Sequence, residues 1–231
     1  MSKLAKAAVL AWLAAACALG HANTVAGGSR CHGKVGNGSL EGAVQLPADG
    51  ANFSAYSTLA VGMGRNYVHS EVAAIMLDAW RALQDTAPGA VYVYGETGLA
   101  QGGRFRPHRT HQNGLSVDFF VPVRDGQDRP ARLPTPATLR FGYDIEFDRH
   151  ARYGTYRIDF AAMAEHLYQL DLAARARGRS LALVIFDPAY LPRLFDTPRG
   201  PALRKLNFMQ GKPWVRHDEH YHIDFAIPCL K

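Results

Sequence analysis

Hydrophobic residues recur along this chain with two different periods, and the periods predict both helices and strands. In residues 67–87 the apolar positions follow one face of a helix, with Ser70 as a suitable N-cap. These apolar positions are Val72, Ile75, Met76, Trp80 and Leu83. Residues 158–180 predict a second helix that ends near Gly178. Two amphipathic helices of this length indicate a globular core against which they pack.

Shorter apolar runs predict strands at four places. They cover residues 89–98, 115–121, 181–188 and 220–227. Helices and strands do not alternate regularly, which favours an α+β domain over a doubly wound sheet. Residues 124–156 are rich in Arg, Asp and Pro and have little periodicity. We expect them to form a long excursion from the core that borders a cleft.

The N-terminus has the pattern of a secretory signal. Two lysines precede an apolar run in residues 7–20, and small residues follow as far as Ala22. The run is shorter than the roughly 20 apolar residues that a spanning helix needs. We therefore expect residues 1–22 to be a signal peptide and residues 23–231 to form one domain without a membrane span. A retained membrane anchor and lipidation at Cys17 are the alternatives.

The charge of the chain changes this picture only slightly. The formal net charge is +6, and removal of the two lysines in the signal segment lowers it to +4. Such a mild basic excess is compatible with an acidic polymer of the cell envelope as partner. The chain has no dense Lys/Arg run, which argues against nucleic acid as a partner.

Two cysteines remain after the expected cleavage. Cys31 lies near the new N-terminus and Cys229 lies near the C-terminus. In an oxidising compartment we expect the two to form an intramolecular disulfide that ties the chain ends together. Two free buried thiols are the alternative.

Histidines are concentrated in two short segments that precede or begin predicted strands. Five of the ten histidines are His108, His111, His217, His220 and His222. Because side chains alternate along a strand, residues 220, 222 and 224 share the face opposite to an apolar set. By the same alternation, Asp118 lies on the non-core face of the strand at residues 115–121.

A metal site follows if these two strands are neighbours. The pair Asn113-Gly114 is a strong turn signal and can fold His111 back towards Asp118. His111, Asp118 and His222 then converge as two imidazoles and a carboxylate with an open position, as in catalytic zinc sites. Neither cysteine has a paired zinc-binding spacing, which favours an open site over a closed structural one.

Two sequence motifs resemble those of a known family. HRTHQNGLSVDFF (108–120) and KPWVRHDEHYHIDF (212–225) look like the metal-site motifs of the penicillin-insensitive murein endopeptidases, grouped with lysostaphin, D-Ala-D-Ala metallopeptidases and hedgehog. The shared group pattern is a His, an Asp several residues later, and a distant His-x-His. His108, the run 112–114 and His217 match the narrower family pattern. Residues 37–53, 64–72 and 102–105 also resemble this family.

The resemblance implies a periplasmic Zn²⁺ enzyme with an antiparallel sheet flanked by helices and the zinc on one sheet face. The implied substrates are the cross-linked peptides of peptidoglycan, chiefly the D-alanyl to meso-diaminopimelyl bond. The implied metal ligands are His111, Asp118 and His222. His220 is the implied catalytic histidine, with His217 and His108 beside it in the catalytic site. The segment after Asp118 is longer than the family pattern, and the family's extra cysteines are missing.

The mechanism expected from these residues is metal-assisted hydrolysis of an amide. The chain has no HExxH helix, so His220 takes the place of a glutamate base and receives the proton of the attacking water. His217 or His108 is expected to donate a hydrogen bond to the oxyanion. Two alternatives stay open: a D,D-carboxypeptidase or dipeptidase of the same group, and a non-enzymatic envelope protein that binds zinc or peptidoglycan.

Overall fold

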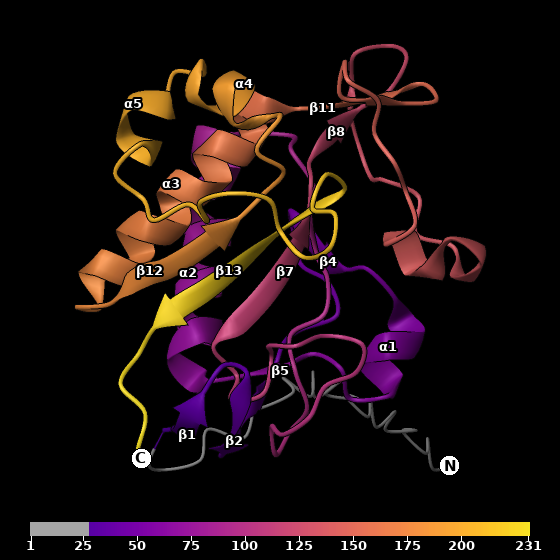
Figure 1. The fold of residues 1–231 in the computed structure, drawn as a ribbon. Helices are drawn as coiled ribbons and strands as arrows, with labels where there is room; N and C mark the ends of the chain where they lie inside the picture. The colour runs from indigo at the N-terminus through magenta and orange to yellow at the C-terminus, as the bar shows by residue number, and fades with distance from the viewer. Residues whose placement is uncertain (1–27) are drawn as a thin grey trace, which may run out of the picture.

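The computed structural model describes residues 28–231, and the expected signal peptide 1–22 with Cys17 lies outside the described residues. The described chain is a mixed arrangement of helices and strands, as the irregular order of the sequence patterns predicts (Figure 1). No helix in residues 28–231 is long and apolar enough to cross a membrane.

A five-stranded sheet forms the centre of the molecule, in the order β12-β13-β7-β6-β4. Its strands are β4 (Phe53–Ala55), β6 (Tyr92–Tyr94), β7 (Ser116–Phe120), β12 (Ser180–Ile185) and β13 (His220–Ala226). The β12–β13, β13–β7 and β7–β6 pairs are antiparallel, whereas β4 and β6 are parallel. The expected wholly antiparallel sheet is therefore wrong at this edge. The reason is that α2 lies between β4 and β6 in the chain, and such a crossover returns the chain in the same direction.

Three smaller sheets accompany the main sheet, so the expectation of one central sheet is also incomplete. Their strands are β1 (Arg30–Lys34) with β2 (Asn37–Glu41), β3 (Val44–Gln45) with β5 (Tyr67–Val68), and β8 (Val123–Arg124), β9 (Pro130–Ala131), β10 (Arg152–Tyr153) and β11 (Tyr156–Ile158). Of the last four, β9 and β10 lie within the excursion and β8 and β11 lie at its two ends, and a 3-10 helix (Ala137–Gly142) lies in the same segment. The excursion is thus locally folded where the sequence showed little periodicity.

Two long helices, α2 (Ser70–Thr86) and α3 (Phe160–Ala176), pack against each other and cover the apolar face of the main sheet (Figure 1). The side chain of His69 accepts a hydrogen bond from Glu71 N at 3.1 Å, so His69 caps α2 and the expected cap at Ser70 is one residue too late. The short helices are α1 (Thr58–Gly62), α4 (Leu191–Phe195) and α5 (Gly200–Leu203). Both long helices lie on one side, which leaves the other sheet face free for the polar side chains.

A disulfide joins Cys31 to Cys229, two residues separated by 198 positions in the chain. Backbone hydrogen bonds reinforce this connection, because Leu230 N donates to Cys31 O at 2.8 Å and Gly33 N donates to Leu230 O at 2.9 Å. The predicted pairing is confirmed, and the alternative of two free thiols does not hold. Closing so long a loop restricts the unfolded chain strongly in the chain-entropy description of disulfides.

The described core contains a histidine from outside the two histidine-rich segments. His166 of α3 is fully buried, and its ring stacks on Tyr92 and meets Phe119 edge to face at 4.8 Å between centroids. Its Nδ1 hydrogen-bonds the Tyr221 hydroxyl from β13. Burial lowers the pKa of His166 from 6.5 to about 3, so the ring stays neutral in the folded protein.

We expect His166 to make folding stability fall as the pH falls from 6.5 to about 3. In that range the unfolded chain binds a proton at this position and the folded protein does not, so protonation favours unfolding. The fall in the pKa from 6.5 to about 3 corresponds to roughly 5 kcal/mol of unfolding free energy. Urea unfolding measures the free energy of unfolding across this pH range. As the pH falls, this free energy should decline less steeply in the double variant His166→Phe/Tyr221→Phe than in the single variant Tyr221→Phe. Equal slopes in the two variants would contradict the assignment.

Candidate metal centre and active site

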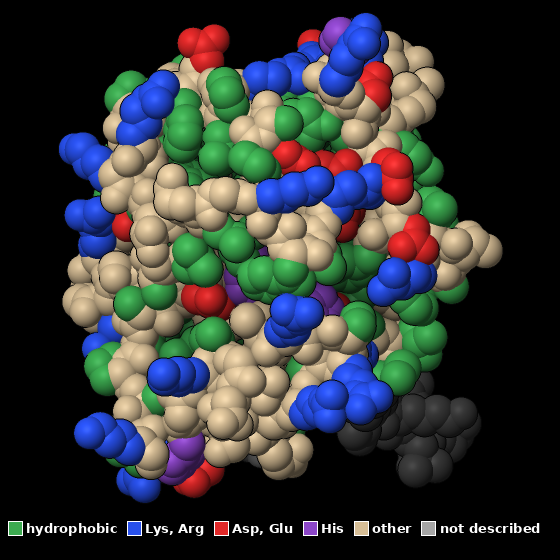
Figure 2. Space-filling model, viewed as in Figure 1, with side chains coloured by type: hydrophobic (Ala, Val, Ile, Leu, Met, Phe, Trp, Pro, Cys, Tyr) green, Lys and Arg blue, Asp and Glu red, His purple; other side chains and the backbone are tan. Residues whose placement is uncertain are grey.

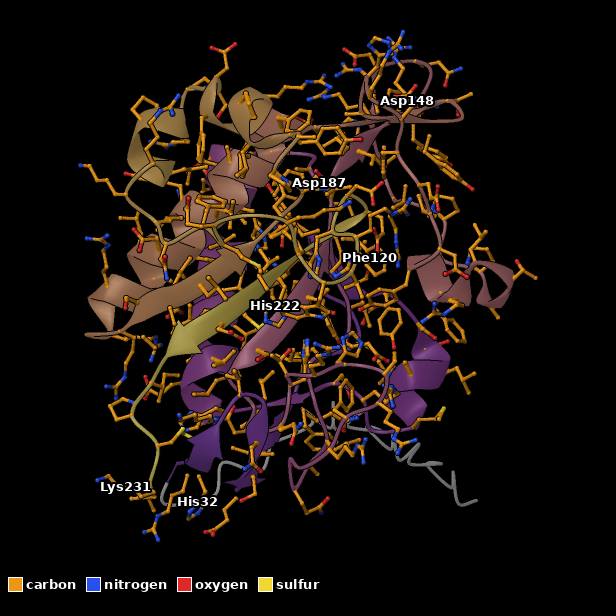
Figure 3. All side chains as sticks on the ribbon, viewed as in Figure 1. His32, Phe120, Asp148, Asp187, His222 and Lys231 are labelled. Carbon is orange, nitrogen blue, oxygen red and sulfur yellow. A yellow bond between two sulfur atoms is a disulfide. The ribbon has the colours of Figure 1, made fainter. Side chains whose placement is uncertain are left out.

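The pairing of β7 with β13 places the two predicted polar sets side by side. In the antiparallel register His222 lies opposite Asp118, and Ile223 lies opposite Val117. Val117 and Ile223 are fully buried under the helices, whereas Asp118 and His222 point to the opposite face. Figure 3 shows His222 on β13 next to β7. The two strands are therefore neighbours, which is the condition for the metal site predicted from the sequence.

The turn before β7 folds His111 back onto the sheet, as its sequence predicts. His111 has a positive φ of 66°, a backbone conformation that is uncommon for residues other than glycine. Its fully buried ring places Nε2 3.3 Å from Asp118 Oδ1, while Nδ1 donates to Thr97 O at 3.2 Å. Nε2 has no hydrogen-bond partner among the described residues. A buried nitrogen without a partner points to a ligand at this position.

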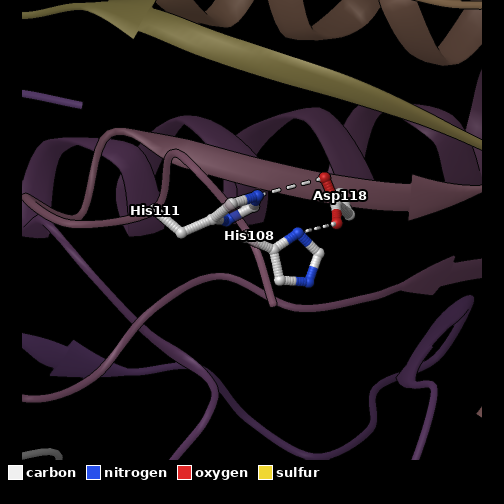
Figure 4. Close-up of side chains that lie close together, drawn as sticks. All are labelled: His108, His111 and Asp118. Atoms are coloured by element: carbon white, nitrogen blue, oxygen red, sulfur yellow. Dashed lines mark ion pairs between the residues drawn. The ribbon is translucent and has the colours of Figure 1, made fainter. Parts of the chain in front are cut away.

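His108 completes a compact group with His111 and Asp118 (Figure 4). Each of the three offers a ligand atom, and these atoms all lie within 4.8 Å of one another. His108 Nδ1 is 3.7 Å from Asp118 Oδ2, and Nε2 donates to Glu96 Oε2 at 2.8 Å. Glu96 is in turn held by Arg65 and by the Tyr56 hydroxyl. The sequence placed His108 beside the ligands, and the geometry also makes it a candidate ligand.

His222 lies between two carboxylates. Its Nδ1 is 2.9 Å from Asp118 Oδ1 and its Nε2 is 2.8 Å from Asp224 Oδ1, which also accepts from the Ser116 hydroxyl. Burial opposes protonation of this ring, but the charges of Asp224 and Asp118 outweigh it and raise the pKa of His222 to about 10. A proton at Nδ1 therefore occupies the place between His222 and Asp118 that a cation would take.

Asp118 is the residue on which these contacts converge, and it stays ionised. Burial disfavours its charge, but the neighbouring His111 and His220 and the hydrogen bonds to the carboxylate hold its pKa well below 3.8. The Tyr143 hydroxyl donates to Asp118 Oδ2 at 3.0 Å and accepts from Glu96 N at 3.0 Å. Tyr143 comes from the excursion, so this segment contributes directly to the site.

The donor set fits a zinc ion. Two or three imidazoles with one carboxylate are ligands that Zn²⁺ prefers. Each histidine also has its other ring nitrogen on a second group: His111 on Thr97 O, His222 on Asp224 and His108 on Glu96. Such outer hydrogen bonds orient imidazole ligands in metal sites. Together with the unpartnered Nε2 of His111, these contacts match what a metal would require of this chain.

Two further histidines lie beside this group, with ring centroids 4.6 Å apart. Burial lowers the pKa of both His217 and His220 to about 4, so both rings are neutral near pH 7. His217 Nδ1 donates to Val215 O at 2.9 Å, and His220 Nδ1 is 2.7 Å from Glu219 Oε1. Neutral imidazoles in this position can accept protons from a substrate or from water.

A pocket of about 430 Å³ opens over these residues. His108, Asp118 and the three histidines of residues 217–222 line it, with Trp214 and Tyr143 in its walls. Figure 2 shows histidine atoms in a hollow near the middle of this face, with arginine or lysine and hydrophobic side chains around it. The excursion contributes several wall residues, so the expectation that it borders a cleft is confirmed.

The structure brings together all six residues that the sequence singled out: His108, His111, Asp118, His217, His220 and His222. Sequence reasoning missed Glu96, Tyr143 and the contact of Glu219 with His220. Glu219 lies within the second motif, directly before His220, so the sequence could have indicated this contact. Glu96 lies in the strand predicted at residues 89–98 and Tyr143 lies in the excursion, but no motif marks either residue as functional.

Comparison with known proteins gives a consistent set of relatives. A model of the penicillin-insensitive murein endopeptidase family matches residues 31–230. A protein of that name from Salmonella heidelberg (strain SL476) is 25% identical over 232 residues, which covers 96% of this chain and 77% of the relative. Another of that name from Escherichia coli O1:K1 / APEC is 26% identical over 209 residues, covering 89% of this chain and 69% of the relative.

Proposed function

The chain belongs to the penicillin-insensitive murein endopeptidase family, and from this membership and the geometry of its site we propose a zinc-dependent murein endopeptidase. Its substrates are the peptide cross-links of peptidoglycan, and the bond it hydrolyses is the D-alanyl to meso-diaminopimelyl amide. It acts in the periplasm after removal of residues 1–22. The observation that supports the proposal most strongly is the buried, unpartnered Nε2 of His111 facing Asp118 beside His222.

The proposed ligands are His111 through Nε2, Asp118, and His222 through Nδ1, because Asp224 holds the other nitrogen of His222. His108 lies close enough to Asp118 to replace or join them. When bound, Zn²⁺ supplies Lewis acidity that polarises the scissile carbonyl and makes water nucleophilic near neutral pH. A metal at this position would take the place of the proton on His222 Nδ1, so His222 would have to lose that proton to act as a ligand.

His220 is the proposed general base. Its pKa of about 4 keeps the ring neutral at pH 7, and it lines the pocket beside Asp118. With Nδ1 against Glu219, the other nitrogen, Nε2, is the one that accepts the proton of the attacking water. The same nitrogen then passes that proton to the leaving amine. A positioned acid–base group of this kind contributes about 10² to 10⁴ in rate.

His217 and His108 take positioning roles in this proposal. A carbonyl oxygen only accepts, so the hydrogen of neutral His217 is on Nδ1 and its Nε2 presents a lone pair. His217 therefore accepts a peptide N–H of the substrate and donates to an oxyanion only when protonated. Glu96 holds the hydrogen of His108 on Nε2 in the same way. The expected oxyanion donation by either ring thus requires the charged form.

The proposal predicts that the protein converts purified cross-linked muropeptide dimers to monomers only when zinc is present. Mass analysis of the products, with zinc and separately with a chelator, provides the measurement. Penicillin should neither inhibit the reaction nor label the protein, because the proposed mechanism uses no serine or cysteine nucleophile.

Other products would redirect the assignment. Dimers that stay joined but lose a terminal alanine would identify a carboxypeptidase. Unchanged dimers in a sample with bound zinc would favour an envelope protein that binds zinc or peptidoglycan without hydrolysis.

A further inference from the structure

Glu219 lies directly before β13 and is almost completely buried beside the proposed general base. The residue is 2% exposed, and its Oε1 lies 2.7 Å from His220 Nδ1. Val121 N donates to Glu219 O at 3.0 Å, which continues the β7–β13 pairing by one residue beyond the strand. The sheet therefore fixes the backbone of Glu219, and the contact with His220 does not depend on a mobile loop.

The surroundings of Glu219 favour its role as hydrogen-bond acceptor. Asp218, its neighbour, accepts from Phe147 N at 2.7 Å and pairs with Arg216 Nε at 2.9 Å. Burial raises the pKa of each of these two carboxyl groups to about 7. Asp218 is thus held by groups away from His220, whereas the hydrogen-bond partner of Glu219 Oε1 is His220 Nδ1, so the ionised Glu219 accepts from this nitrogen.

We propose that Glu219 is a positioning residue that holds His220 as the Nδ1–H tautomer, with the Nε2 lone pair available in the pocket. The inference rests on the proposed function, since it explains how His220 is prepared to accept a proton there. Which ring nitrogen carries the hydrogen is set by the partner of the other nitrogen. A carboxylate against Nδ1 also favours the imidazolium that forms when Nε2 receives the proton.

The contact itself can be tested in the metal-free protein at pH 8, above the pKa of about 7 of Glu219, without any assay of activity. Long-range ¹H–¹⁵N spectra of the labelled protein distinguish the two imidazole tautomers, and the signals of His220 are those lost in His220→Gln. We expect the wild-type ring to carry its proton on Nδ1. Glu219→Ala should shift the population towards the Nε2–H form, whereas Glu219→Gln, whose amide oxygen still accepts, should retain Nδ1–H.

Kinetics on cross-linked dimers test the consequence. Glu219→Ala should lower kcat by about 10- to 100-fold and leave KM within about twofold, with zinc affinity unchanged. Glu219→Gln should recover part of the kcat that Glu219→Ala loses. A merely structural defect would not be rescued in this way. Glu165→Gln is a matched control, because Glu165 is a buried carboxylate on α3, paired with Arg199 outside the pocket. It should keep the wild-type kcat.

Two results would overturn the inference: a wild-type His220 with its proton on Nε2, or a Glu219→Ala variant with unchanged tautomer and kcat. If the wild-type protein cleaves no cross-links, the proposed function fails instead. The tautomer spectra then decide by themselves whether Glu219 orients His220, because they require neither zinc nor substrate.

Discussion

Asp118→Asn should abolish zinc binding and reduce cross-link cleavage by about 10³-fold or more. Asp118 is 1% exposed and contacts His111, His222 and Tyr143, so the substitution removes the charge at the centre of the site while keeping its volume. A metal Lewis acid contributes several kcal/mol to the transition state, and each 1.36 kcal/mol is about tenfold in rate. No other group in the proposed ligand set can replace the lost negative charge.

Two measurements separate the loss of metal from the loss of fold. Zinc at about 1,000 times its Kd should stabilise the wild-type protein by about 4 kcal/mol and leave Asp118→Asn unchanged. Asp171→Asn is the control, since this carboxylate pairs with Arg175 on the outer part of α3. The control should bind zinc like the wild type. Stoichiometric zinc at wild-type affinity in Asp118→Asn would show that the metal binds elsewhere.

His220→Gln should lower kcat by about 10² to 10⁴ and leave zinc affinity within a few-fold of the wild type. The reason is that His220 lines the pocket but is not among the proposed ligands, so its loss removes proton transfer and not the metal. Steady-state kinetics on muropeptide dimers and a chelator competition for zinc measure the two effects separately. His150→Gln, at an exposed histidine outside the pocket, is the control.

The opposite pattern would reassign His220. A variant that keeps full kcat excludes it as the base, and attention would turn to His217, whose pKa is also about 4. A variant that loses zinc together with activity would make His220 a ligand. Because the two readouts differ between these cases, the role of His220 can be decided without a bound structure.

Several features of the fold and the site follow from the sequence through local rules. The period of two in residues 115–121 and 220–227 determines which side chains face the helices, and the residues predicted for the core face are buried. The turn at Asn113-Gly114 returns His111 to the sheet because its chemistry is also local. The spacing of two cysteines near the chain ends indicated the disulfide.

Other features were decided by tertiary structure alone, because they depend on contacts between residues that lie far apart in the sequence. The parallel β4–β6 edge, the burial of His166 and the contact of Tyr143 with Asp118 are of this kind. The sequence by itself determined that imidazoles and a carboxylate share one sheet face. Only the packing of the excursion and of the loop bearing Glu96 decided which groups orient those side chains, since hydrogen-bond partners far apart in the chain are selected by the folded backbone.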